Sequence, residues 1–267
     1  MIEYAIVVGV GLIGALLMGM IGIGSALLCV PALIFVLPAL GVAPESVVHT
    51  ALGTTMLAIG LQSVTSVIAH NKRGNVDWQV LRTTLPGGVV GIILGVSFTS
   101  ILSGDVLRII FALFILFSAG RLVFDKSKVA AHDVGGNTKG KGVLAAGSCA
   151  IGFLASFIGA GGGVFAVPFL NWCGLQMRRC VGTSNANGLP IALTGALTYG
   201  VTGYAAIGYS QIQVGYIHLP TFVVLAISGM IAAPLGARLA NVVSAKIIKW
   251  FFAILVVVIA TQMIVGG

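Results

Sequence analysis

Paired glycine breaks beside neutral hydrogen-bond donors are the residues of this sequence best suited to chemistry. The stretches 21–31 (IGIGSALLCVP) and 158–168 (IGAGGGVFAVP) carry Ile, Gly, Gly, Val and Pro at matching positions, both in strongly apolar surroundings. Consecutive glycines interrupt a helix and let a ligand or another backbone come close. A helix that starts after such a break presents free N–H groups and a positive dipole end. The two stretches therefore predict a site for an anion.

Hydroxyl and amide side chains follow each break at matching places. Gly53-Thr54-Thr55 corresponds to Gly182-Thr183-Ser184, and the run 183–188 concentrates donors next to an expected helix start. The alternative interpretation is that these small and polar residues only pack helices together in lipid. Paired broken segments in two halves of a membrane protein favour a transport site instead. The predicted substrate-binding residues are Gly24, Ser25, Thr54, Thr55, Gly161, Gly162, Gly163, Thr183, Ser184, Asn185 and Asn187.

Acidic residues are absent from the middle of every apolar segment, which argues against a cation as the main substrate. They lie at segment ends or in loops: Glu3, Glu45, Asp77, Asp105, Asp125 and Asp133. The sequence contains no phosphate-binding loop, nucleophile elbow or zinc-protease motif. Its 4 cysteines form no C-x-x-C pair and are expected to be buried hydrophobic residues. We therefore expect no enzyme, no cofactor and no metal site, and a proton-coupling role for His49 or His218 stays open.

The composition excludes a soluble globular domain. The chain of 267 residues is 58% hydrophobic and only 7% charged, with a mean hydropathy of +1.12, whereas soluble domains are about 25% charged. The net charge of +8 does not indicate nucleic-acid binding, because the basic residues lie in loops between apolar segments. The expected partners are the lipid bilayer and a small anionic substrate.

Ten apolar segments predict an all-α fold, a polytopic membrane helix bundle. The second segment of each half is short, so it is either a full crossing or part of a re-entrant hairpin, which leaves eight to ten spanning segments. The expected domains are a first membrane repeat over 1–124, a cytoplasmic linker over 125–141 and a second membrane repeat over 142–267. The segments cover about 2–20, 25–40, 46–69, 79–101 and 105–124, then 142–158, 162–175, 180–206, 213–237 and 245–265.

The positive charges predict how the chain is oriented. If every segment crosses, Arg108 is the single one of the 14 Lys and Arg residues on the side that holds both termini. Cytoplasmic loops carry the excess of positive charge, so both termini are expected outside, in the periplasm of a bacterium with an inner membrane. An odd number of crossings per half then inverts the second repeat relative to the first.

The sequence resembles the TauE/SafE family of sulfite-exporter-like membrane proteins over nearly its whole length. The resemblance is carried by the two glycine stretches ending in Val-Pro, the paired Gly-Thr-Thr/Ser motifs, the loop 70–78 and the late stretch 236–240. One departure is Ser25-Ala26, which stands where the second copy has Gly162-Gly163.

The resemblance implies a secondary transporter that exports, and in some members takes up, small sulfur-containing anions such as sulfite or sulfonates, including sulfoacetate. A passive channel for anions or small solutes, an uptake permease for a sulfur oxyanion, and a membrane enzyme or assembly subunit are the alternatives. The residues do not specify the anion, the direction, the coupling ion (H⁺ or Na⁺) or the oligomeric state.

Overall fold

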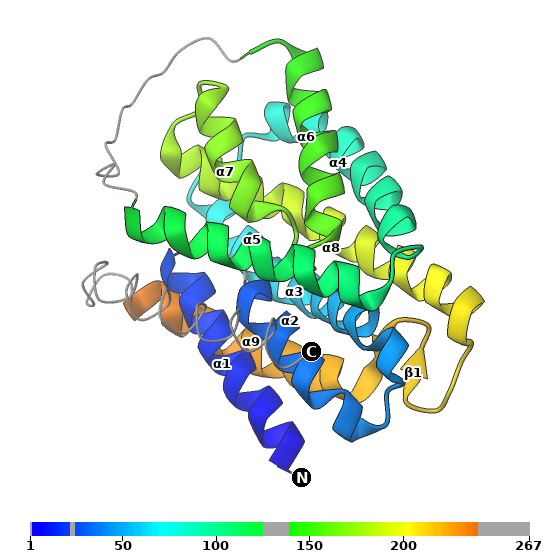
Figure 1. Ribbon diagram of the computed structural model, residues 1–267. Coiled ribbons are helices and arrows are strands. Elements are labelled where there is room, and N and C mark those ends of the chain that lie inside the picture. Colours follow the sequence, from blue (N-terminus) through cyan, green and yellow to red (C-terminus); the bar gives the residue numbers. More distant parts are fainter. Residues whose placement is uncertain (1, 22–24, 125–138, 240–267) are drawn as a thin grey trace.

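Helices make up nearly all of the described chain, which confirms the expected helix bundle. The computed structural model describes residues 2–21, 25–124 and 139–239 (Figure 1). The segment expected at 245–265 and most of the linker lie outside these residues. The helices are α1 (Ile2–Ile21), α2 (Ala26–Val36), α3 (Val47–Lys72), α4 (Trp78–Thr99) and α5 (Gly104–Phe124), then α6 (Lys141–Ser156), α7 (Gly163–Trp172), α8 (Met177–Ile207) and α9 (Leu219–Leu239).

Two helices in each half begin or end at the glycine stretches, and the second of each pair is short. The first stretch separates α1 from α2, and the second separates α6 from α7. Two single turns of 3₁₀ helix, Pro38–Leu40 and Pro44–Ser46, connect α2 to α3. The shortness expected for the second segment of each half is therefore present, with 11 residues in α2 and 10 in α7.

A small hairpin departs from the all-helical expectation. Strands β1 (Gln213–Val214) and β2 (Ile217–His218) pair antiparallel between α8 and α9. The segment expected at 213–237 therefore begins too early, because α9 starts only at Leu219. The hairpin carries no charged residue and includes Val214, Tyr216 and Ile217, so the sequence analysis joined it to the apolar helix that follows.

The fourth helix of each half packs against the first helix of the other half. α4 of the first half packs along α6 of the second, and α9 of the second half packs along α1 of the first, while α3 and α8 cross each other at the centre. Figure 1 shows the α4–α6 pair above this crossing and the α1–α9 pair below it. Each glycine break thus lies in a framework built from both halves.

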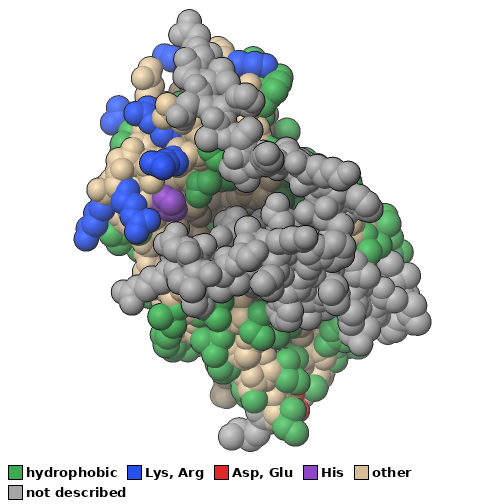
Figure 2. All heavy atoms as spheres, turned by 90° about the vertical axis from the view of Figure 1, so that its left-hand side faces the viewer, with side chains coloured by type: hydrophobic (Ala, Val, Ile, Leu, Met, Phe, Trp, Pro, Cys, Tyr) green, Lys and Arg blue, Asp and Glu red, His purple; other side chains and the backbone are tan. Residues whose placement is uncertain are grey.

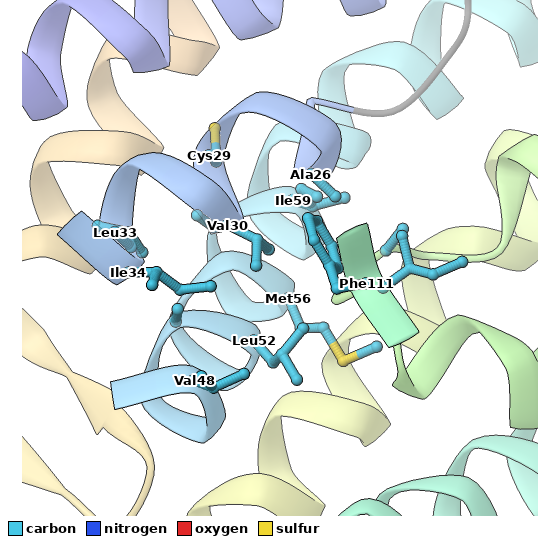
Figure 3. Packing of buried hydrophobic residues seen from close by; sticks show 14 of the residues in the cluster. Ala26, Cys29, Val30, Leu33, Ile34, Val48, Leu52, Met56, Ile59 and Phe111 are labelled. Atoms are coloured by element: carbon cyan, nitrogen blue, oxygen red, sulfur yellow. The ribbon is translucent and has the colours of Figure 1, made fainter. Parts of the chain in front are cut away.

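The apolar side chains fill the bundle and also cover its outside. Figure 3 shows α2 packed on α3, with Val30, Leu52 and Met56 between them and Phe111 of α5 closing one side. Other large apolar side chains, such as Leu113 and Phe117 of α5, are exposed. Contiguous exposed apolar surface of this kind is typical of helices that contact lipid.

Candidate functional site

The second glycine stretch, which leads into α7, lies wholly within the described residues. Gly162 is the residue before the helix, and its φ of +78° is a left-handed conformation that favours glycine. The carbonyl of Gly162 accepts from the amides of Phe165 (3.0 Å) and Ala166 (2.9 Å), so the helix is closed from its first turn. No side chain caps this end among the described residues. The first amides of α7 are therefore the N–H groups that an anion can bind.

α8 lies directly against this helix start. The backbones of Gly161 and Gly188 approach so closely that a Cβ on Gly161 would lie 2.7 Å from the Gly188 carbonyl oxygen. The hydroxyl oxygen of Ser184 lies 3.7 Å from the position that a Cβ on Gly163 would take. Ser184 is buried, and its hydroxyl has no hydrogen-bond partner in the described part of the chain. A buried donor without a partner therefore faces the first residue of α7.

Asn187 adds a second polar group one turn along α8. Its Nδ2 donates to the hydroxyl of Ser148 on α6 at 3.2 Å, and its Oδ1 is buried without a partner among the described residues. A hydroxyl both donates and accepts, so the Ser148 contact is kept if the Asn187 amide is flipped by 180°. The flipped amide would leave its NH₂ unpaired in place of its oxygen. Asn187 can therefore present either an acceptor or a donor.

Thr54 and Thr183, which the sequence predicts as substrate-binding residues, bind backbone amides instead. The hydroxyl oxygen of Thr54 accepts from the backbone amide of His218, and that of Thr183 accepts from the amide of Asp77, both at 2.9 Å. Each bond joins the third helix of one half to the residue just before the fourth helix of the other half. The neighbouring glycines do the same, because Gly53 lies against the Tyr216 carbonyl and Gly182 against the Asn75 carbonyl.

The residue after each threonine remains free. The Thr55 hydroxyl is buried with no partner among the described residues. The matching Ser184 is a buried residue, and its hydroxyl forms no hydrogen bond with the described part of the chain. Asn185 is only partly buried and donates to the carbonyl of Val181 in its own helix at 2.9 Å. The expectation that the run 183–188 lies next to a helix start is wrong, since α8 begins at Met177 and the run lies within it.

The first break differs from the second. Gly24 lies outside the described residues. Ser25 stands before α2 but makes no capping bond, and its hydroxyl instead donates to Oε1 of Gln62 at 3.3 Å. Gln62 also donates from Nε2 to the Leu225 carbonyl of α9 at 2.9 Å. Gln62 was not among the predicted site residues, and its signal is a long amide side chain in the apolar middle of α3.

Comparison with known proteins identifies the chain. The sulfite exporter TauE/SafE family matches residues 7–263. The chain belongs to the TauE/SafE family. A "Probable membrane transporter protein" of Haemophilus influenzae is 29% identical over 256 residues, 95% of each chain. Proteins with the same description are 25% identical over 241 residues in Methanocaldococcus jannaschii (89% of this chain, 86% of that one) and, named YdhB, 24% identical over 245 residues in Bacillus subtilis (88% and 89%).

Membership of this family makes the chain a multi-pass membrane transporter. No solved structure matches it. The helical stretches Pro44–Lys72 and Trp78–Thr99 are long and apolar enough to cross a bilayer by themselves, and shorter apolar helices accompany them. Among the described residues, no group of three His, Cys, Asp or Glu side chains is arranged to hold a metal ion.

Most of the described basic residues of this TauE/SafE protein gather at one end, and Arg108, near the start of α5, lies apart from them. Figure 2 shows the Lys and Arg side chains at the upper end of the molecule, where α3 ends and where α4, α6 and α8 begin. Arg179 pairs with Asp77 there at 3.4 Å, and the Lys139 ammonium lies 3.0 Å from the Trp172 ring centroid. The remaining residues at this end are Lys72, Arg73, Arg82, Lys141 and Arg178.

Proposed function

We propose that this TauE/SafE protein is a secondary transporter that exports small sulfur-containing anions, such as sulfite or sulfonates, by alternating access. The description of its family as sulfite exporters supports the substrate class and the direction. The names of its relatives support membrane transport.

The start of α7 carries this proposal. It combines uncapped backbone amides with the free hydroxyl of Ser184 and the amide of Asn187. Within the described residues the acidic side chains lie at helix ends, and Asp77, which contacts α8 next to Ser184, is paired with Arg179. Neutral donors suit a carrier, because they hold an oxyanion through several hydrogen bonds without trapping it.

We place the principal anion contacts at the second break. There the helix start consists of glycine backbone, the Ser184 hydroxyl lies beside Gly163, and Asn187, one turn further along α8, has an unpaired polar atom among the described residues. At the first break Gln62 already occupies the Ser25 hydroxyl. Thr55 is the candidate contribution of the first half, since its hydroxyl is the counterpart of Ser184 and is also unpaired in the described chain.

We also propose that the basic end faces the cytoplasm of a bacterial cell with an inner membrane, and that both termini lie in the periplasm. The gathering of Lys and Arg at one end supports this orientation. The repeats then have inverted topology, with linker 125–141 on the cytoplasmic side.

Counterflow in liposomes tests the function. Purified protein should exchange labelled sulfite, thiosulfate or sulfoacetate against the same unlabelled anion, and exchange should saturate. Absence of exchange with these anions and with sulfate would contradict anion transport. Single-channel currents far above carrier rates would contradict alternating access in favour of a channel.

The Gly163→Ala variant tests the site. The new methyl group would meet the Ser184 oxygen at an ordinary 3.7 Å, so the fold should accept it while the space at the helix start is filled. We expect counterflow to fall sharply in protein that is inserted normally. Gly9→Ala is the matched control, because a Cβ there has no neighbour within 4 Å. Unchanged affinity in Gly163→Ala would show that these glycines only pack helices.

A further inference from the structure

Two equivalent junctions hold the halves of the molecule together. At the basic end, Thr183 binds the amide of Asp77, the residue before α4. At the opposite end, Thr54 binds the amide of His218, the residue before α9. The first junction also contains the ion pair between Asp77 and Arg179. The second has His218 in the place of Asp77, and it has His49 five residues before Thr54, where the first has Arg178 five residues before Thr183.

Both histidines are buried, and each has one free ring nitrogen. Nε2 of His49 lies 3.1 Å from the Thr99 carbonyl, so it carries the proton, and Nδ1 is left with no partner among the described residues. The ring stacks on Tyr216 of the hairpin, with centroids 4.9 Å apart. Burial of an unpaired polar atom costs free energy and calls for an explanation.

His218 has a corresponding arrangement. Nδ1 of the His218 ring accepts from the backbone amide of Thr221 at 3.4 Å and lies 3.0 Å from the Thr221 hydroxyl. Nε2 therefore carries the proton, and this buried N–H has no acceptor among the described residues. Each ring thus keeps one nitrogen without a partner inside the junction: a basic nitrogen on His49 and an N–H on His218.

The other titratable side chains around the two rings are tyrosines. Tyr199 bonds to the Ser156 carbonyl (3.0 Å) and the Thr99 hydroxyl (2.9 Å), and Tyr216 stacks on His49. No ion pair involves either histidine within the described chain. The charged residues on the elements around the junction are Glu3, Glu45, Asp105 and Arg108, near the starts of α1, α3 and α5.

We propose that His49 and His218 bind the proton that drives transport, and that protonation opens the hairpin junction. A charge on either ring cannot stay buried without a partner, so the hairpin must move and admit water. The junction at the basic end has Asp77 and Arg178 at the two corresponding places and no histidine there. This inference rests on the proposed transport function and names its coupling ion.

The sign of the pH dependence follows from burial. Burial lowers the pKa of His218 in the closed junction, whereas an exposed histidine has a pKa of about 6.5. The closed junction is therefore fully stable above about pH 6.5. It loses stability as the pH falls from there toward the lowered pKa. Acid on the side of the hairpin should open it.

Hydrogen–deuterium exchange of the full chain in nanodiscs tests proton binding without any substrate. After correction for intrinsic rates, protection of residues 208–218 should fall severalfold between about pH 8 and about pH 5. Protection of residues 84–96, in the middle of α4, should not change. The double variant His49→Gln/His218→Gln should lose the pH response, whereas His70→Gln should keep it. His70 is the matched control because its Nδ1 is also buried and unpaired in the described structure. Protection that is independent of pH, or equal in the double variant, would overturn the proposal.

Transport provides the second arm, with sulfoacetate as the probe because its charge is constant over this pH range. In wild-type liposomes a gradient of one pH unit should drive up to about tenfold accumulation per coupled proton. The double variant should keep counterflow at equal pH and lose the accumulation. Accumulation that persists in the double variant would overturn proton coupling through these rings. Absence of counterflow in the wild type would instead count against the proposed function. The hydrogen–deuterium exchange experiment would still decide whether the two histidines bind a proton.

Discussion

Adjacent hydroxyl residues take different roles in α3 and α8. Thr54 and Thr183 bind backbone amides of the opposite half, while Thr55 and Ser184 keep free hydroxyls. The sequence predicts both pairs, because their motifs match. It does not separate their members, since the role of each hydroxyl depends on which backbone approaches it. Gln62 was missed for the same reason, as its two partners come from α2 and α9.

Replacing Ser184 with alanine should weaken anion binding without affecting the fold. One neutral hydrogen bond contributes about 0.5–1.5 kcal/mol, so the apparent affinity in counterflow should fall about two- to tenfold. Thr198→Ala is the control on the same helix, because the Thr198 hydroxyl only donates to the Thr194 carbonyl at 2.8 Å. Equal affinities for the two variants would remove Ser184 from the site.

Replacing Thr183 with valine should act differently from replacing Ser184. Valine removes the acceptor for the Asp77 amide and leaves a buried donor unpaired, which costs about 1–3 kcal/mol. We expect a lower midpoint of thermal unfolding for Thr183→Val, with the affinity of the remaining folded protein close to wild type. A large loss of affinity with unchanged stability would return Thr183 to the substrate site.

The sequence predicts the long helices well, but it does not predict the hairpin or the start of α8. Long apolar runs locate α1, α3, α4 and α5 within a few residues, because lipid and core both demand continuous apolar surface. The hairpin was not predicted, since its strands have two residues each, which is too short for an alternating pattern to show. The start of α8 was placed too late, because Met177, Arg178 and Arg179 interrupt the apolar run although they belong to the helix.

Variants of Asp77 test whether the helix cap or the ion pair with Arg179 stabilises the start of α4. The Asp77 carboxylate accepts from the amides of Gln79 (3.2 Å) and Val80 (3.1 Å) and also pairs with the exposed Arg179. Caps contribute about 0.5–2 kcal/mol, whereas exposed ion pairs contribute about 0–1 kcal/mol. Asp77→Ala should therefore lower the thermal midpoint more than Asp77→Asn, which keeps the cap. Equal losses would assign the stabilisation to the ion pair.

At the scale of the whole molecule, charge and topology can be tested together. A reporter that is active only in the periplasm should be active when inserted after Ser210 of the hairpin loop or fused after Gly267. The same reporter inserted after Asn75, at the basic end, should be inactive, and a cytoplasmic reporter there should be active. The reverse pattern would overturn the orientation and leave the charge distribution unexplained.

The packing of each fourth helix against the first helix of the other half has a consequence for biogenesis. α1 leaves the ribosome long before its main partner, α9, which begins only at Leu219. α4 is likewise synthesised before its partner, α6. Until those helices are synthesised, the small-residue faces of α1 and α4 stand unpaired in the bilayer, open to lipid or to an insertase. Premature termination between the halves should therefore leave a fragment that is inserted but unassembled, and a substrate for membrane proteases.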